Sequence, residues 1–407
     1  HFTLVEAMSV AENVHLGQEG GFFLRQRSME KRVARLASRY ELQVDPGKKV
    51  FDLSMGEKQR VEILKLLHRQ SRVLIFDEPT AVLTPTETEQ LFQALRLMAA
   101  QGKAVVFISH KLREIMTIAD EVFILRRGKV IDRMEMSDVE STSDLARRMV
   151  GREVLFQVER EQIPLGETVL ELENLTGEGF SGINLTIRQG EILALVGVAG
   201  NGQKPLVETI CGLRDPNGGT ASLFGRGLSH FYGPSGDQRF MSYIPEDRLG
   251  LGTCPNLTLV ENFLMTNRND FRKGPFLDRN GAARAGEKSL RTFNVQPPNP
   301  QALARRLSGG NLQKMVLARE FFHNPRFILA EQPTQGLDIS ATEEVWKHLI
   351  QAKHNAGILL VTGDLNEAMK LADRIAVIFQ GRLMAVFSSA DKQMVDSIGP
   401  MMAGIPV

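Results

Sequence analysis

The chain contains two adjacent carboxylates, Asp77 and Glu78, in a setting where catalytic acids are often found. They follow the apolar run at residues 73–76, and Pro79 and Thr80 come next. Acids at the carboxyl end of a buried strand face the crevice in which α/β sheets bind ligands. Asp77 can hold Mg²⁺ directly or through water, and Glu78 can polarise an attacking water as a general base. Such a pair is often only solvated, so this interpretation depends on the motifs around it.

A glycine-rich loop lies between the apolar run at residues 192–196 and a helical pattern around Leu206. Glycines let backbone N–H groups converge on phosphate oxygens, and a helix N-terminus favours negative charge. The loop and the two residues after it are Gly197, Val198, Ala199, Gly200, Asn201, Gly202, Gln203 and Lys204. A complete P-loop has Lys and then Ser or Thr after its last Gly. Here Gln203 and Lys204 take those positions. The loop can cradle a nucleotide, but it lacks the hydroxyl that binds Mg²⁺; the alternative is a tight turn.

A second candidate anion site is formed by Ser308, Gly309, Gly310 and Asn311. These residues precede a helical run at residues 313–321. N–H groups at a helix start, together with a serine hydroxyl, can bind an anion. In isolation the segment is an ordinary helix cap.

A weaker counterpart of this segment contains Ser54 and Gly56. Met55 replaces one glycine, and Glu57 brings negative charge close to the candidate anion site.

His110 lies downstream of Glu78 and follows the apolar run at residues 104–108. A histidine there can reach a γ-phosphate and link it to the base, although a lone histidine after a strand is usually structural.

These motifs occur twice along the chain. The matched pairs are Ser54 and Ser308, Pro79 and Pro333 (both at an offset of 254), Asp120 and Asp373, Gly128 and Gly381 (both 253), and Asn13 and Asn262 (249). Near-constant spacing in one order indicates two homologous domains of about 250 residues. Only eleven residues precede Glu12, whereas about 95 residues of the second copy precede Glu261. We therefore expect the first copy to lack its N-terminal portion and the full protein, as two such domains, to have about 500 residues.

The elements that carry the motifs predict an α/β fold with a mainly parallel sheet. Short apolar runs at residues 73–76, 104–108, 192–196, 327–329 and 358–361 predict buried strands. Helical patterns alternate with them; one begins with Thr84, Pro85 and a capping-box Glu87. We assign residues 1–150 to the first domain, 151–167 to a linker and 168–407 to the second.

The composition excludes several classes of protein. Charged residues make up 24% of the 407 residues and the net charge is +1, which argues against a broad nucleic-acid-binding surface. The two cysteines fit a reducing compartment. No run approaches the roughly 20 apolar residues that span a bilayer, so any membrane role requires a partner.

The ordered combination of motifs resembles the ATP-binding cassette (ABC) ATPases. More narrowly, it looks like the duplicated cassettes of bacterial monosaccharide and nucleoside importers. The resemblance implies two tandem P-loop cassettes, the first incomplete, that bind ATP and Mg²⁺. It also makes Ser54 and Ser308 part of the family's Leu-Ser-x-Gly signature segments. Glu246 stands where this resemblance places a Gln. Gln332, followed by Pro333 and Thr334, resembles the nucleoside branch more than the ribose or galactose branch.

The resemblance further implies two composite nucleotide sites, each joining the P-loop of one cassette to the signature segment of the other. Site one would join the missing first P-loop, Asp77, Glu78 and His110 to Ser308, Gly309 and Gly310. Site two would join Gly197–Lys204, Glu331, Gln332 and Gly363 to Ser54 and Gly56. In site two Glu331 replaces the metal-binding Asp, Gln332 the catalytic Glu, and Gly363 the switch His. We therefore expect site one to hydrolyse ATP and site two to bind nucleotide weakly or structurally.

As such a subunit, the protein would lie on the cytoplasmic face of the membrane and drive two transmembrane permease subunits, which an extracytoplasmic solute-binding protein supplies with solute. The chain alone would be nearly inactive. Two alternatives stay open: a soluble duplicated cassette protein acting on ribosomes or DNA, and an inactive truncated gene product. The short linker, the near-zero net charge and Gln332 argue against the former.

Overall fold

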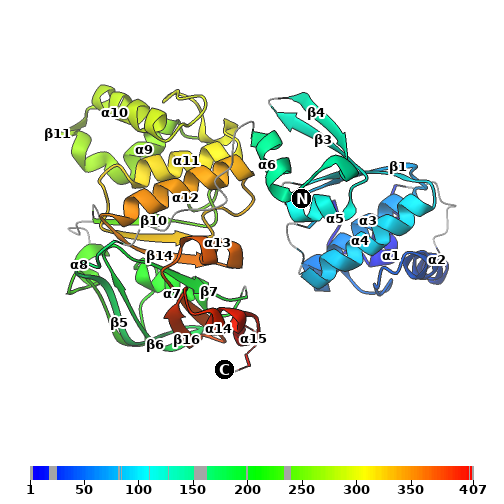
Figure 1. Cartoon of the computed structure of the whole chain (residues 1–407), viewed down its shortest axis with the longest axis horizontal. Helices are drawn as coiled ribbons and strands as arrows, with labels where there is room; N and C mark the ends of the chain where they lie inside the picture. Colours follow the sequence, from blue (N-terminus) through cyan, green and yellow to red (C-terminus); the bar gives the residue numbers. More distant parts are fainter. Residues whose placement is uncertain are drawn as a thin grey trace. The chain divides into compact units, whose positions relative to one another are not determined.

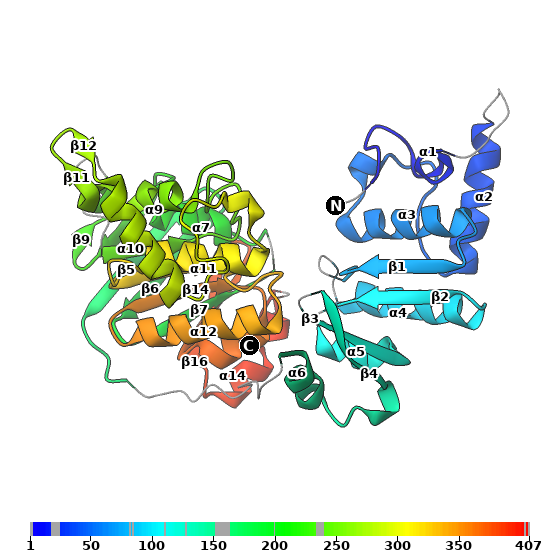
Figure 2. The ribbon, with the colours of Figure 1, turned by 90° about the horizontal axis from the view of Figure 1, so that it is seen from above.

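The computed structural model describes residues 3–17, 25–80, 83, 85–109, 111–126, 128–150, 163–198, 200–232, 240–402 and 404–405. The chain divides into two compact units, His1–Glu153 and Val154–Val407. We call them unit 1 and unit 2 and describe each by itself (Figures 1 and 2). Most of the predicted linker lies outside the described residues. At its end, Gly166 donates a backbone hydrogen bond to Gln189 at 2.9 Å.

Unit 2 is built around a six-stranded sheet in the order β10–β13–β14–β7–β15–β16. Its strands are β10 (Met241–Ile244), β13 (Phe327–Glu331), β14 (Gly357–Thr362), β7 (Ile192–Val196), β15 (Arg374–Phe379) and β16 (Arg382–Ser388). All neighbouring pairs are parallel except β15 with β16. The three central strands are buried along their whole length, as their apolar runs predict. The carboxyl ends of five strands therefore meet at one edge of the sheet.

Two layers cover this sheet, and a helical part adjoins it. An antiparallel sheet and α7 (Gln203–Ile210) together cover one face of the main sheet. Their apolar side chains share a core with Phe327, Leu329 and Ile378 of the main sheet. The strands of this second sheet are β5 (Thr168–Gly177), β6 (Phe180–Arg188), β8 (Gly218–Leu223) and β9 (Arg226–Gly227). The other face packs against α12 (Ile339–Lys353), α13 (Leu365–Leu371) and α15 (Ile398–Met402). The helical part consists of α9 (Leu259–Asn267), α10 (Arg279–Thr292) and α11 (Gly309–Glu320), which have a small core of their own.

Unit 1 repeats part of this architecture. Strands β1 (Val73–Asp77) and β2 (Ala104–Ile108) pair in parallel and lie side by side in Figure 2. Strands β3 (Glu121–Arg126) and β4 (Lys129–Glu135) form a separate hairpin. The helices are α1 (Val10–His15), α2 (Gln26–Arg39), α3 (Met55–His68), α4 (Pro85–Ala100), α5 (Leu112–Ile118) and α6 (Thr142–Val150). Helix α4 begins where the sequence predicts, and its Leu91, Leu95 and Met98 are buried in the core; Thr84, its predicted cap, lies outside the described residues.

The strands of unit 1 expose an apolar face whose counterpart in unit 2 is covered. Six apolar side chains of β1, β2 and β3 are 46–68% exposed, whereas their counterparts in β13, β14 and β15 are at most 3% exposed. The exposed side chains are Val73, Ile75, Val106, Ile108, Phe123 and Leu125. In unit 2 the covering layer is the antiparallel sheet with α7. No described part of unit 1 supplies an equivalent layer.

A matched pair of substitutions tests this difference. Leu329→Thr leaves a cavity and a buried hydroxyl in the core of unit 2, so we expect it to cost at least about 2 kcal/mol of unfolding free energy. Ile75→Thr, at the equivalent position of unit 1, keeps a β-branched residue on an exposed strand, and we expect a cost below about 1 kcal/mol. Native-state hydrogen exchange in β13 and β1 measures both. If Ile75→Thr lowered the unfolding free energy as much as Leu329→Thr does, the apolar face of unit 1 would have to be covered in solution.

Candidate functional site

In unit 1, the two predicted acids lie at the carboxyl end of β1. Asp77 is the last residue of the strand and is exposed, and Glu78 is half-buried. The Glu78 backbone has φ +44°, and its N–H donates to the Ile108 carbonyl at 2.9 Å. Thr80 then donates its hydroxyl to Glu114 at 2.6 Å, which anchors the turn to α5. These contacts turn the chain sharply after the strand and fix where the Glu78 side chain begins.

Unit 2 reproduces the same turn with different side chains. Gln332 has φ +44°, and its N–H donates to the Val361 carbonyl at 2.8 Å. The Thr334 hydroxyl donates to Glu367, also at 2.6 Å. The Gln332 side-chain oxygen accepts from the Gly363 backbone N–H at 3.3 Å. An amide therefore occupies the position that in unit 1 belongs to the Glu78 carboxylate, and it bonds the residue at the predicted switch position.

The neighbouring acid in unit 2, Glu331, is buried and hydrogen-bonded. The Tyr243 hydroxyl on β10 donates to its carboxylate at 2.8 Å. Burial raises the pKa of Glu331 above its ordinary value of 4.5; the Tyr243 hydrogen bond and the Glu246 backbone N–H oppose the rise, while the Glu246 charge adds to it. The predicted site residue Glu246 therefore lies beside Glu331, in the turn that follows β10.

The glycine-rich loop joins β7 to α7, as the sequence predicts. Gly202 has φ +98°, and a Cβ there would lie 2.6 Å from the Gly179 carbonyl, so only glycine fits. The Asn201 and Gln203 side chains both donate to the Val198 carbonyl at 3.1 Å. These bonds tie the loop to itself. Lys204 is exposed on the first turn of α7.

Both Leu-Ser-x-Gly segments cap helices, as predicted. Ser308 is the N-cap of α11, and its hydroxyl accepts from the Asn311 backbone and side chain at 3.4 and 3.1 Å. Ser54 is the N-cap of α3, and its backbone N–H donates to the Glu57 carboxylate at 2.7 Å. The helix start at Ser54 therefore carries a negative charge, and the helix start at Ser308 carries a neutral amide.

Parallel pairing gathers the predicted residues of unit 2 at one sheet edge. Glu331 ends β13, Gly363 follows β14, Gly197 follows β7, and Glu246 lies after β10. In unit 1, Asp77 and Glu78 stand at the equivalent edge, and His110 lies outside the described residues. Sequence reasoning missed three features of the site. They are Tyr243 on Glu331, Asn201 accepting from the Gln380 N–H at 2.9 Å, and the Gly363–Gln332 bond.

Equivalent long-range contacts recur in the helical parts of both units. Lys65 donates to the Thr3 carbonyl at 2.7 Å, and its counterpart in the repeat, Arg319, donates to the Gly252 carbonyl at 2.8 Å. The N-cap pairs Ser9–Glu12 and Thr258–Glu261 both form capping boxes. The sequence repeat is therefore a repeat of structure.

The two units differ in how well they fit a magnesium ion. In the described residues, no three His, Cys, Asp or Glu side chains cluster as a metal site. Unit 2 offers Glu331 and Glu246 but has Lys204 where a P-loop hydroxyl would bind the ion, so this set does not fit a nucleotide-bound Mg²⁺ of the usual kind. The exposed Asp77 carboxylate in unit 1 does fit the role of the metal-side acid.

Comparison with known proteins decides the family. The model of the ABC transporter family matches residues 1–81 and 180–335. The chain is 38% identical to the glucose import ATP-binding protein TsgD13 of Haloferax volcanii, over 99% of this chain and 80% of that protein. It is 39% identical to the guanosine import ATP-binding protein NupO of Bacillus subtilis, over 99% of this chain and 81% of that protein. The chain belongs to the ABC transporter family. Members of this family bind and hydrolyse ATP, typically with Mg²⁺.

Solved ABC structures agree with this fold. An ATP-binding subunit of an ABC transporter superposes with a TM-score of 0.50 at 25% identity, covering 58% of this chain and all of that one. RNase-L Inhibitor superposes with a TM-score of 0.60 over 96% of this chain and 74% of that one; at 19% identity it shows the fold alone. The α/β prediction with tandem ABC cassettes is confirmed. In the described part of the chain, no helix has both the length and the apolar character needed to cross a membrane.

The raised pKa of Glu331 predicts a pH-dependent loss of stability in unit 2. The native state holds the proton more tightly than the unfolded chain, so stability falls as pH rises from about 4.5 through the native pKa. Glu331→Gln should remove this part of the pH dependence, and Tyr243→Phe should extend it to higher pH. The pH dependence is measured from the midpoints of urea unfolding, monitored by the fluorescence of Trp346, the single tryptophan.

Tyr232→Phe is the matched control, because the Tyr232 hydroxyl bonds the Ile210 carbonyl and not Glu331. Equal pH profiles for Glu331→Gln and the unmodified protein would contradict the assignment.

Proposed function

We propose that the protein is the ATP-hydrolysing subunit of an importer for nucleosides or simple sugars. It works at the cytoplasmic face of the membrane with two transmembrane permease subunits and, indirectly, with an extracytoplasmic solute-binding protein. The names of the relatives support this proposal: besides TsgD13 and NupO, the nucleoside import protein NupA of Lactococcus lactis is 37% identical over 95% of this chain and 79% of that protein.

Between the two solute classes, we favour nucleosides. The Gln332–Pro333–Thr334 sequence is similar to the nucleoside branch of the family, and two of the relatives named above are nucleoside importers. Specificity for the solute would reside in the permease and the solute-binding protein.

Hydrolysis in this proposal depends on Glu78 and not on Gln332. The observation that carries it is the shared turn: residues 78 and 332 have the same φ and the same backbone hydrogen bond to the neighbouring strand. Only the carboxylate of Glu78 can accept a proton from water as a general base. By the family resemblance, Glu78 acts with Asp77, His110 and the Ser308–Asn311 segment. The other nucleotide, assigned to Gly197–Lys204 and Gln332, stays bound without being cleaved.

Exchanging the two side chains tests this asymmetry. In the complete gene product assembled with its permease, Glu78→Gln should lower ATP turnover by about 100-fold or more, because general-base catalysis contributes that much. Gln332→Glu should change turnover by less than about threefold, since Lys204, Gly363 and the missing P-loop hydroxyl still depart from a competent site. Phosphate release at saturating ATP measures both.

The chain of 407 residues alone is the companion sample. We expect almost no turnover from it, because its only P-loop candidate is Gly197–Lys204. Turnover near wild type in Glu78→Gln, or robust turnover by the chain alone, would overturn the proposal.

The surface proposed to meet the permease is the segment from Glu246 to Glu261. It adjoins a cleft in unit 2 whose lining includes Leu213, Tyr232, Pro245, Leu251 and Thr266. Leu249, Leu251 and Leu257 are exposed along the segment. An open cleft with exposed leucines at its rim suits an apolar side chain from a partner. The assignment of that partner comes from the family resemblance of this segment.

Introducing a charge in this cleft should uncouple the subunit from its permease. Leu251→Asp puts a carboxylate where an apolar contact is proposed, so we expect at least about tenfold weaker association with the detergent-solubilised permease. ATP-analogue binding should stay unchanged. Ile405→Asp, at another exposed apolar residue, is the control. Undiminished association of Leu251→Asp would refute the assigned surface.

A further inference from the structure

We propose that Glu87 closes the signature segment of the first cassette, Ser54–Glu57, to the phosphates of a nucleotide. The inference rests on the proposed function and deepens it. It gives a reason, in the signature segment of the first cassette, for a low nucleotide affinity of the proposed site that contains Gln332. The contact on which it is based, between Glu87 and Gly56, lies entirely within unit 1.

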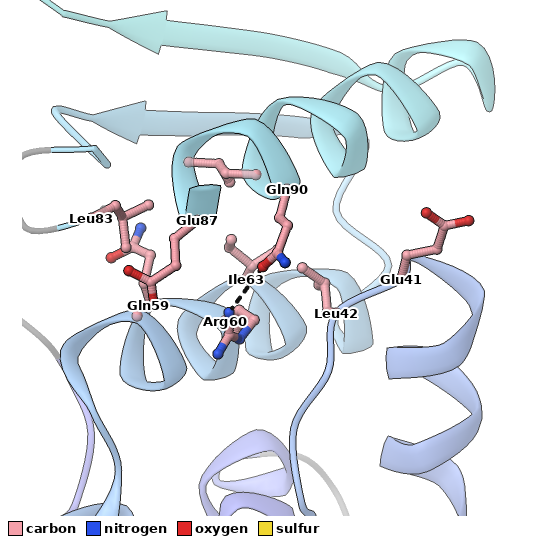
Figure 3. Close-up of a pocket in the computed structure, with 10 residues that line it drawn as sticks. Glu41, Leu42, Gln59, Arg60, Ile63, Leu83, Glu87 and Gln90 are labelled. Carbon is pink, nitrogen blue, oxygen red and sulfur yellow. Dashed lines mark hydrogen bonds between the residues drawn. The ribbon is translucent and has the colours of Figure 1, made fainter. Parts of the chain in front are cut away.

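Glu87 lies on the first turn of α4 and points at the first turn of α3 (Figure 3). The Glu87 carboxylate fills the space that a Cβ would need at Gly56. Without Glu87, the glycine at position 56 would leave the backbone N–H groups at the start of α3 accessible. Helix N-termini bind anions through such N–H groups. Here a side chain of the same unit already lies against that backbone.

The second cassette shows what the same place looks like without this side chain. The counterpart of Glu87 in the repeat is Ala341, whose Cβ lies 3.0 Å from the Cβ position of Gly310. The residue equivalent to Glu57 is Asn311, which bonds the Ser308 hydroxyl through neutral groups. The two signature segments thus share their backbone and differ by two carboxylates.

Cationic side chains lie near both carboxylates of the first segment. Glu57 accepts from the Ser54 N–H and pairs with Lys48 at 3.1 Å. Arg60 lines the same pocket as Glu87, and one of its N–H groups donates to Gln90 at 3.4 Å (Figure 3). The partial positive charge of a helix N-terminus favours an anion, but here the two carboxylates of Glu57 and Glu87 already lie at that end of α3. A triphosphate approaching Ser54 meets a like charge that the second segment lacks.

The internal repeat supplies the substitutions for a test. Glu87→Ala copies Ala341, and Glu57→Asn copies Asn311. We expect the double variant of the full chain to bind the fluorescent nucleotide analogue TNP-ATP at least about tenfold more tightly than the unmodified chain, with Glu87→Ala alone giving most of the gain. Glu87→Gln keeps the size of the side chain and removes its charge, so it should give a measurable gain in affinity that is smaller than that of Glu87→Ala. Because salt screens exposed charges, the gain should shrink at about 1 M salt.

Glu89→Ala, which removes an exposed carboxylate further along α4, is the matched control and should leave affinity unchanged. If Glu87 served only the stability of unit 1, Glu87→Ala would lower the melting temperature and would not tighten TNP-ATP binding. Unchanged affinity in Glu87→Gln and in the double variant would overturn the inference and leave the proposed role of Glu78 standing. Conversely, failure of the Glu78→Gln experiment would not alter this binding result.

Discussion

The candidate site depends on one backbone hydrogen bond, which ties the residue after a central strand to the end of the neighbouring strand. Residue 332 donates to Val361, and residue 78 donates to Ile108. A left-handed non-glycine residue costs of order 1–3 kcal/mol and persists only where the surroundings impose it. Parallel pairing of the strands imposes it here twice. The same pairing brings the loops after β7, β10 and β14 to this edge of the sheet in unit 2.

The two units share the backbone geometry of this turn but differ in the layers that cover their strands. In unit 2 the central strands are covered on both faces, and the Asn201 and Gln203 side chains both donate to the Val198 carbonyl after β7. In unit 1 the equivalent face is open, while the turn at Glu78 retains its geometry. The Asp77–Glu78 acid pair and the fully covered sheet are thus found in different units.

Periodicity and local motifs predicted most of the fold. The five apolar runs became strands within two residues of the predicted ends, and Ser54 and Ser308 became helix caps, because these features depend on local pattern alone. The sequence could not show that Tyr243 reaches Glu331, since the two residues are 88 positions apart and meet only through sheet pairing. It predicted Glu87 as a cap residue, but the contact with Gly56 depends on how α4 packs on α3.

The central claim is that the two nucleotide sites have unequal chemistry because residue 332 is an amide where residue 78 is a carboxylate. The most direct measurement is the fate of nucleotide bound by the complete protein during a single turnover, separated by rapid quench. The account predicts that one of the two bound nucleotides becomes ADP while the other is recovered as intact ATP. Conversion of both to ADP at the same rate would contradict it.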